Sequence, residues 1–455
     1  MLRLRHPICP HDISSVRPRG AWFTGWHPPR QSWLPDMADR ADSANELETP
    51  NTSLPYELLR EIFHQATFIP HEWDVNATSI IPGLFCIRDQ LQLRAWREIL
   101  PLRRAIAQVS SQWRAIALEF LYGTFHDDGK DNKLEAFDSI LSDCPHYAKL
   151  VKRLSMRLRR EPDHNAQVAR VLLHCPNLLI IDIEEVFGHD RLDSMTLSNL
   201  TDLSTTIRQL DLTNVPTNTV FTVLNQLPNL EILSISEIDD DVLGPDWTCP
   251  PFTVLPNLRI LQLLFATYDD IIEVYMKNLK APRLTSLSIR TYSYSIPKLP
   301  DEMAHHLLYL EFVFPHNWLR GWRADDLPNL RCLQLRWQDL SWDIFRSHLP
   351  MKQIVELTCN LPSLNDDNLL RKRPLLDGMI GFTLDPNLMP NLKSFTLDME
   401  NMTRKLLSGE EDTGSGLRAW FTSLITAFDQ RGVDLYFYPA DLLHGKVLMG
   451  DILEA

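Results

Sequence analysis

The stretch Pro228-Asn229-Leu230-Glu231-Ile232-Leu233-Ser234-Ile235 decides the fold, because the chain repeats its pattern. Pro-Asn-Leu occurs six times, and five copies begin the same phrase: apolar, two variable, apolar, one variable, apolar. These five phrases start at Leu178, Leu230, Leu258, Leu330 and Leu392. Without Pro-Asn, the phrase recurs at Val151, Ile207, Leu284, Leu307 and Ile354. A unit that recurs ten times describes an architecture rather than a local motif.

Each phrase predicts a short strand that is entered from a turn. Its last two apolar residues are two positions apart and therefore point to one face of a sheet. A proline after an apolar residue, as in Leu227-Pro228, ends the helix that comes before the strand. The phrases start 23 to 38 residues apart, and most intervals fall in or near the range of about 20–29 residues that is typical of leucine-rich repeats. The phrase leucines are the predicted core.

We therefore predict an α/β fold in which an N-terminal helical module precedes an irregular leucine-rich-repeat solenoid, a horseshoe with a parallel sheet. The solenoid is irregular because the repeat lengths vary. In addition, the asparagine expected three residues beyond the last leucine of a regular repeat is mostly absent. Such a solenoid commonly serves as a binding surface, so its function resides in the variable residues between the leucines.

Composition bounds the partners of this 455-residue chain. Its formal net charge of −14 argues against nucleic acid and against an anionic membrane as the main partner. No run approaches about 18 continuous apolar residues, so no membrane-spanning helix is expected. The seven cysteines form no Cys-x-x-Cys pair, and their odd number suits a reducing compartment. We expect the protein in the cytoplasm, the nucleus or both.

A second pattern lies between residues 51 and 125. The run 54–63 reads Leu-Pro-Tyr-Glu-Leu-Leu-Arg-Glu-Ile-Phe and predicts an amphipathic helix that Pro55 begins. Residues 109–117 read Val-Ser-Ser-Gln-Trp-Arg-Ala-Ile-Ala and continue a second helical pattern. The run Leu-Tyr-Gly-Thr-Phe at 121–125 then ends the unit.

The combination of these three pieces resembles an F-box domain, and in particular the F-box proteins of mushroom-forming fungi, where such a motif precedes an irregular leucine-rich array. This chain departs from the compact motif by an insertion at about 64–100. The resemblance implies docking on the Skp-type adaptor of a cullin–RING ubiquitin ligase. Matched position by position, it assigns adaptor binding to six residues. They are Leu54, Pro55, Leu58, Ile62, Val109 and Trp113.

The chain divides into five predicted segments. Residues 1–50 are predicted to be a disordered tail, with a true start at Met37 or a targeting segment as the alternatives. The remaining segments are an F-box-like helical domain at 51–125, a linker with a capping helix at 126–150, the leucine-rich-repeat domain at 151–440 and a C-terminal tail at 441–455. A flexible loop is expected at 408–416, and a last strand at 433–437 after a helix near 417–430.

Substrate contact is expected from strand residues that alternate with the leucines and face the inner side of the horseshoe. Arginine and aromatic residues gather in the later phrases, and these residue types are the usual anchors of protein interfaces. The basic residues among them suit an acidic or phosphorylated segment. The alternative is that several of the aromatic residues are core. The predicted substrate-binding residues are Arg290, Tyr292, Tyr294, Trp318, Arg336 and Trp337.

No catalytic constellation is present in the sequence. It lacks phosphate-binding glycine loops, a His-Glu-x-x-His helix and a Gly-x-Ser-x-Gly elbow. His305-His306 reads as a surface or satisfied pair, and Asp239-Asp240-Asp241 as a solvated turn. We therefore expect no catalytic residue, no cofactor and no metal.

The expected function is that of a non-catalytic substrate receptor in a Skp/cullin/F-box ubiquitin ligase, acting in ubiquitin-dependent degradation. The helical module docks the adaptor, and the solenoid binds a protein substrate that the sequence does not name. The alternative is a leucine-rich-repeat scaffold or interaction protein outside any ligase.

Overall fold

The structure is a computed structural model of the whole chain. It describes these residues: 54–69, 72, 85–127, 133–158, 162–185, 205–213, 217–236, 252–264, 269–290, 299–313, 326–336, 351–360, 377–378, 380–398, 416–437 and 447–448. The predicted tail at 1–50, residues 70–71 and 73–84 of the insertion, and the predicted loop at 408–416 lie outside the described residues. Among the helices that are described, none combines the length and the apolar character that crossing a membrane requires.

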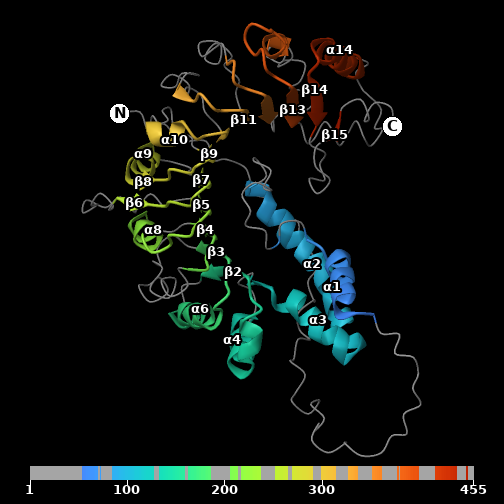
Figure 1. Ribbon diagram of the computed structural model, residues 1–455, viewed down its shortest axis with the longest axis vertical. Coiled ribbons are helices and arrows are strands. Elements are labelled where there is room, and N and C mark those ends of the chain that lie inside the picture. The colour runs from blue at the N-terminus through green and yellow to red at the C-terminus, as the bar shows by residue number, and fades with distance from the viewer. Residues whose placement is uncertain are drawn as a thin grey trace, which may run out of the picture. The chain divides into compact units, whose positions relative to one another are not determined.

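A single sheet runs through the repeat region (Figure 1). Its strands follow one another almost in chain order; twelve pair in parallel, and the last joins antiparallel. The strands are β1 (Thr124–His126), β2 (Arg153–Leu158), β3 (Ile180–Glu185), β4 (Gln209–Thr213), β5 (Ile232–Ser236), β7 (Ile260–Leu264), β9 (Ser286–Arg290), β10 (Tyr309–Val313), β11 (Cys332–Arg336), β12 (Glu356–Asn360), β13 (Ser394–Asp398), β14 (Asp434–Phe437) and β15 (Val447–Leu448).

Each of the ten predicted phrases forms one of these parallel strands, from β2 to β13. Neighbouring strands pair in register, so Leu233 of β5 lies between Leu210 of β4 and Leu261 of β7. The first, fourth and sixth residues of all ten phrases are buried in one continuous hydrophobic cluster. The repeat prediction is therefore confirmed as a solenoid-like parallel sheet, and its order fits a leucine-rich-repeat architecture.

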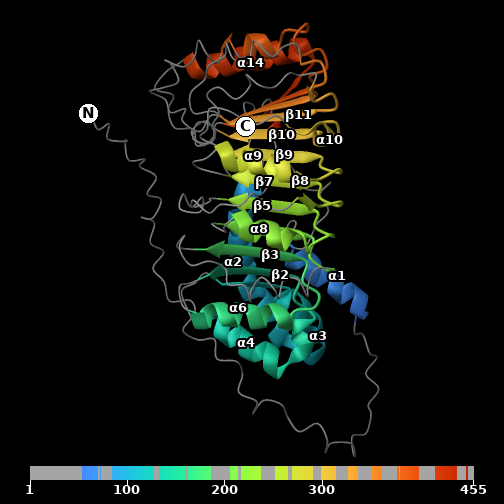
Figure 2. The same cartoon turned by 90° about the vertical axis from the view of Figure 1, so that its left-hand side faces the viewer.

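Helices cover one face of this sheet. Figure 2 looks onto them and shows α6, α8 and α9 stacked in front of the strands. The helices of this region are α4 (Lys133–Asp143), α5 (Pro145–Ala148), α6 (Pro162–His174), α8 (Thr217–Leu224), α9 (Asp269–Asn278), α10 (Asp301–Ala304) and α14 (Gly416–Arg431). The predicted capping helix is α4, which buries Leu134, Phe137 and Leu141 in the cluster. The predicted final helix and strand correspond to α14 and β14.

The recurrent Pro-Asn-Leu has a structural explanation. In the phrase that opens with Leu258, the side-chain Nδ2 of Asn257 donates to the backbone oxygen of Pro228, one repeat earlier, at 3.1 Å. The other phrase-opening asparagines make the same cross-repeat bond at 2.6 to 3.1 Å: Asn177, Asn229, Asn329 and Asn391. Before Ile354, Gln353 makes it instead, at 3.3 Å. Side-chain amides therefore tie successive turns together where the strands begin.

The N-terminal helices have their own small core. They are α1 (Tyr56–Ala66), α2 (Phe85–Val109) and α3 (Ser111–Tyr122). The Ser110 side chain caps α3 by accepting from the backbone N–H of Trp113 at 3.1 Å, which separates α3 from α2. The buried cluster of this module contains Leu59, Phe63, Ile106, Ala107, Ile116, Ala117 and Phe120. It is distinct from the cluster of the repeats.

The structure also contains elements that the phrases did not predict. β1 lies at the end of the unit predicted at 51–125, yet it pairs with β2 and begins the sheet. A second sheet joins β6 (Thr253–Val254) to β8 (Leu279–Lys280). β15 is a third such element. All of these strands are two or three residues long, too short to show an alternating pattern.

Candidate protein-binding surfaces

One side of α1 presents apolar side chains to solvent. Leu58 and Ile62 on α1, and Leu54 two residues before the helix, follow one another at four-residue intervals and are about half exposed, at 53%, 49% and 47%. The opposite side of the same helix buries Leu59 and Phe63 in the small core. The helix therefore has two apolar sides, of which folding uses only one.

The structure places the other predicted adaptor-binding residues in different environments. Pro55 is exposed at the N-cap of α1, and Val109 is exposed at the end of α2. Trp113 is partly buried, and its ring meets that of Phe63 edge-on at 4.9 Å between centroids. Trp113 therefore contributes to internal packing, whereas Val109 contributes to the surface.

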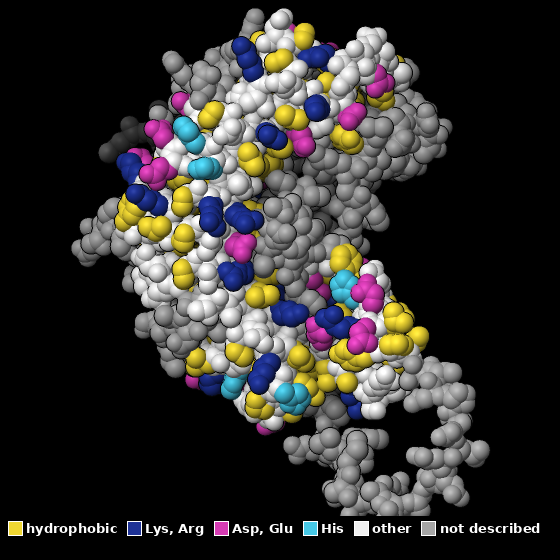
Figure 3. Space-filling view, in the orientation of Figure 1, with side chains coloured by type: hydrophobic (Ala, Val, Ile, Leu, Met, Phe, Trp, Pro, Cys, Tyr) yellow, Lys and Arg dark blue, Asp and Glu magenta, His cyan; other side chains and the backbone are white. Residues whose placement is uncertain are grey.

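Sequence reasoning missed further exposed apolar residues in this module. Tyr56, Phe68 and Leu102 are each about half exposed. Leu102 precedes Val109 by seven residues on α2, a spacing that places both on one side of a helix. That spacing was the signal that could have found it. Figure 3 shows the resulting concentration of hydrophobic side chains over α1 to α3.

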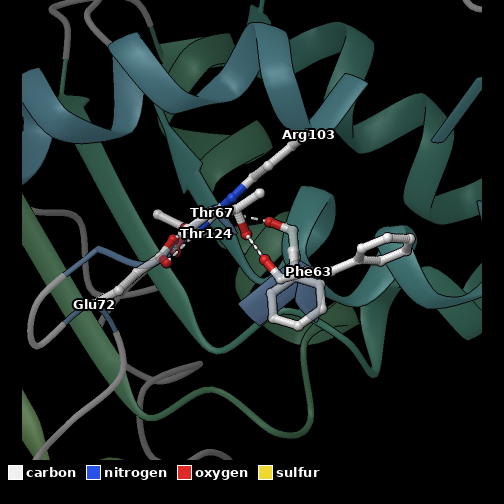
Figure 4. A network of polar contacts seen from close by, with 6 residues as sticks. Phe63, Thr67, Glu72, Arg103 and Thr124 are labelled. Atoms are coloured by element: carbon white, nitrogen blue, oxygen red, sulfur yellow. Dashed lines mark hydrogen bonds and ion pairs between the residues drawn. The ribbon is translucent and has the colours of Figure 1, made fainter. Parts of the chain in front are cut away.

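A buried polar network holds the module together (Figure 4). The Arg103 guanidinium, on α2, donates from two nitrogens to the Glu72 carboxylate at 2.9 and 2.6 Å. It also donates to the backbone oxygens of Phe120 in α3 and Thr67 just beyond α1, at 2.8 and 2.9 Å. The Thr124 hydroxyl, in β1, donates to Glu72 at 2.8 Å. The network thus joins all three helices to the first strand of the repeat sheet.

Glu72 lies within the predicted insertion at about 64–100 and still provides the counter-charge for Arg103. Arg103 is almost fully buried and Glu72 nearly so. A buried guanidinium is tolerated only when it is paired and hydrogen-bonded, as here. At this residue, therefore, the insertion supports the packing of the helices.

A second, more exposed ion pair lies beside the first. Arg60 of α1 donates to both carboxylate oxygens of Glu119 on α3, at 3.0 and 2.9 Å. This hydrogen bond and the charge of Lys152, 3.4 Å from Glu119, hold the pKa of the Glu119 carboxyl below its ordinary value. Because Lys152 directly precedes β2, Glu119 also links the helical module to the repeats.

The predicted substrate residues are only partly described. Arg290 ends β9 and is partly exposed, on the strand face that was predicted. Arg336 ends β11 in the neighbouring part of the sheet, but its side chain lies outside the described residues. The four aromatic residues, Tyr292, Tyr294, Trp318 and Trp337, also lie outside them. Their proposed gathering therefore stays a prediction.

In the early repeats, the face of the sheet that points away from the helices carries paired charges. Arg153 forms an ion pair with Asp182 at 2.7 Å. Arg157 forms a bidentate pair with Glu184 at 2.7 and 2.8 Å. These side chains lie on neighbouring strands β2 and β3 and neutralise each other, so they are poorly suited to attract a charged ligand.

The later strands continue this pattern with buried side chains. Glu311 on β10 accepts from Ser288 at 2.8 Å and from Gln334 at 3.2 Å. Gln334 in turn accepts from the Tyr309 hydroxyl at 2.8 Å. Hydrogen bonds thus run across β9, β10 and β11. The described part of this face is largely occupied with bonds to itself.

The described residues offer no cluster that could hold a metal ion. Within them, no group of three or more His, Cys, Asp or Glu side chains is placed to hold a metal ion. Burial raises the pKa of the Cys175 thiol to about 12 and also raises that of Cys359. Both thiols are therefore protonated near neutral pH and serve as small core residues.

Comparison with known proteins adds little to this picture. The sequence matches no protein-family model and no curated protein. Among solved structures, a protein from Bacteroides fragilis, a structural-genomics target, resembles 63% of this chain over 71% of its own length, with 14% sequence identity and a TM-score of 0.29. A similarity at that level indicates neither the fold family nor the function of this chain, so its function is inferred from the surfaces described above.

Proposed function

We propose that this protein is a non-catalytic substrate receptor: the exposed side of α1 docks a Skp-type adaptor, and the repeat region binds a protein to be ubiquitinated. One observation carries the proposal. Leu54, Leu58 and Ile62, which the F-box resemblance assigns to the adaptor, are exposed, although α1, which carries the last two, buries Leu59 and Phe63. Exposed apolar side chains that gather on one helix are typical of a partner surface.

The proposed mechanism is bridging. A receptor of this kind performs no bond chemistry itself, and it raises the effective concentration of the substrate beside the transferring subunits. Such a role requires a defined connection between the two binding regions. The Arg103–Glu72–Thr124 network and the Glu119–Lys152 pair support it, because both join the helices to the first strands of the sheet.

The test is co-purification of the full chain with a Skp-type adaptor. The variant Leu58→Ala/Ile62→Ala removes two exposed apolar side chains and should weaken the complex at least tenfold, since central apolar contacts dominate interface energies. The matched control is Leu173→Ala/Leu308→Ala. It removes two leucines of similar exposure from the repeat region and should leave adaptor binding unchanged.

The rival function is a leucine-rich-repeat scaffold outside any ligase. It predicts a well-folded chain that forms no complex with the adaptor. Failure of the wild-type chain to bind the adaptor, while its circular dichroism spectrum shows a folded protein, would overturn the receptor proposal. Equal weakening in both double variants would also overturn it, because the effect would then not be specific to α1. Membership of the mushroom-forming-fungus group of F-box proteins belongs to the same proposal.

A further inference from the structure

A row of basic residues borders the first apolar residue of the phrases. Of the twenty positions directly before and after that residue in the ten phrases, six are Lys or Arg and one is acidic, Glu231. The six are Lys152, Arg208, Arg259, Arg283, Arg331 and Lys393. Such an excess is notable in a chain with a net charge of −14. The excess acidic residues of the chain therefore lie outside these twenty positions.

The fold gathers these residues at one edge of the sheet, where the strands begin. The backbone fixes them there: the N–H of Arg259 donates to the oxygen of Glu231 at 2.9 Å, and that of Glu231 to the oxygen of Arg208 at 2.7 Å. Bonds of this kind connect each repeat to the one before it. In Figure 3, dark-blue side chains follow this edge across the strands.

Among the described residues, the arginines of this edge that form side-chain hydrogen bonds have neutral partners rather than acidic ones. Arg208 donates to the backbone oxygen of Asn229 at 3.2 Å, and Arg283 to the Asn257 side-chain oxygen at 3.2 Å. Both partners are neutral. Across the part of the chain that the structure describes, no acid pairs with Arg208, Arg283 or the other basic residues of the row except Lys152, which contacts Glu119. The contrast is with Arg153 and Arg157, whose acids lie on the next strand.

Exposed apolar side chains lie at the same edge. Phe252, directly before β6, and Val254 of β6 are about half exposed, and the ammonium of Lys280 on β8 lies 4.8 Å from the centre of the Phe252 ring. A cation above an aromatic face leaves both groups accessible to a ligand that carries carboxylates and apolar side chains. Leu308, directly after the first leucine of its phrase, is also exposed.

We infer that this strand-start edge is a binding site for an extended acidic polypeptide segment that also carries aromatic or apolar side chains. Arg208 and Arg259 directly precede β4 and β7, which lie two strands apart in the sheet, and two strand spacings are about 10 Å. A segment in the extended polyproline II conformation has three residues per turn and rises about 3.1 Å per residue, so carboxylates at every third residue point to one side about 9 Å apart and match these cations. A nucleic acid fits less well, because a duplex carries about one charge per 1.7 Å and the net negative charge of the chain opposes it more strongly than a peptide with one carboxylate per three residues.

This inference rests on the proposed function only in assigning the segment to the substrate. Peptide binding and adaptor binding use different residues and are measured separately. A chain that binds the adaptor but not the peptide would refute the inference and leave the receptor role standing. A chain that binds the peptide but not the adaptor would do the reverse.

The test is fluorescence anisotropy with the full chain and a fluorescein-labelled synthetic peptide that carries glutamate at every third residue and phenylalanine and glycine between. We expect binding that weakens as salt is raised and that is absent for the lysine counterpart of the peptide. Arg283→Glu should weaken binding about tenfold. Lys277→Glu makes the same charge change on the exposed surface of α9 and should change it less than twofold.

A second variant tests the apolar part of the site. Phe252→Ser should weaken binding of the phenylalanine peptide about tenfold and leave a serine-substituted peptide unaffected. Equal losses of peptide affinity in Arg283→Glu and Lys277→Glu would show that the peptide responds to the overall charge of the chain, and would overturn the proposed site. A single-stranded oligothymidylate that bound more tightly than the peptide, and lost affinity in Arg283→Glu, would overturn the choice of a polypeptide partner.

Discussion

The helical module and the repeat sheet distribute their apolar and polar residues differently. In the sheet, every apolar position of the ten phrases is buried, and the described polar side chains pair with one another on the free face. In the module, an apolar side of α1 is left exposed while a guanidinium and a carboxylate are buried. Folding alone does not demand the module's arrangement, which is why its surface is the stronger candidate for a partner.

The two regions also differ in how their stability is distributed. The sheet repeats the same burial in each turn, so loss of one contact is shared among neighbouring units. The module has only a small apolar cluster, and one arginine reaches all of its helices. The module should therefore respond to single changes more sharply than the sheet.

Arg103→Met is expected to have the largest effect. It leaves the Glu72 carboxylate buried without its counter-charge, and such removal of one partner costs about 3–5 kcal/mol of unfolding free energy. Hydrogen exchange should rise in α2 and α3 and remain unchanged in β5 to β11. Arg60→Met breaks the more exposed pair with Glu119 and should cost about 1 kcal/mol or less.

The double variant Glu72→Leu/Arg103→Met sharpens the same test. Replacing both members of a buried pair with apolar residues is often close to neutral, so protection of α2 and α3 should largely return. If Arg103→Met alone leaves hydrogen exchange in these helices unchanged, the network does not hold the module together. The module would then not depend on a single buried arginine.

Leu233→Ala compares buried and exposed leucine directly. Leu233 is fully buried in β5, and its truncation should cost about 2–5 kcal/mol in urea unfolding. Leu58→Ala removes the same atoms from an exposed site and should change stability by about 0.5 kcal/mol or less. Equal costs at the two positions would show that the exposed side of α1 is part of a core, and would remove the basis for partner docking.

Most of the sheet could be predicted from the sequence, because its signal repeats. The phrase leucines recur with a fixed internal spacing, and all ten predicted strands form. β1, β6 and β8 could not be predicted, since their pairing is decided by the neighbouring repeat rather than by their own residues. The Glu72–Arg103 pair was equally invisible, because 31 positions separate its members.

The candidate surfaces were predicted less completely. Exposure of Leu54, Leu58 and Ile62 follows from helical spacing together with a known motif, whereas Leu102 belongs to no motif and was missed. The basic edge also could not be predicted from the sequence, since its residues lie outside the positions that alternate with the leucines. Residues beside the first leucine, such as Arg259 and Arg283, form a row only once the strands are aligned.

The smallest predicted effect comes from Asn257→Ala, and it tests why Pro-Asn-Leu recurs. The variant removes one cross-repeat hydrogen bond to the oxygen of Pro228 and should cost about 1 kcal/mol of unfolding free energy. The chain contains its own control in Asn387, which belongs to the one Pro-Asn-Leu copy that opens no phrase. There the backbone N–H donates to Asp385 at 2.8 Å, and alanine keeps that N–H, so Asn387→Ala should be nearly neutral. If urea unfolding gives the two variants equal losses of unfolding free energy, the asparagines act only in forming the turns. A loss that is about 1 kcal/mol larger for Asn257→Ala shows that the cross-repeat hydrogen bonds stabilise the stack of repeats.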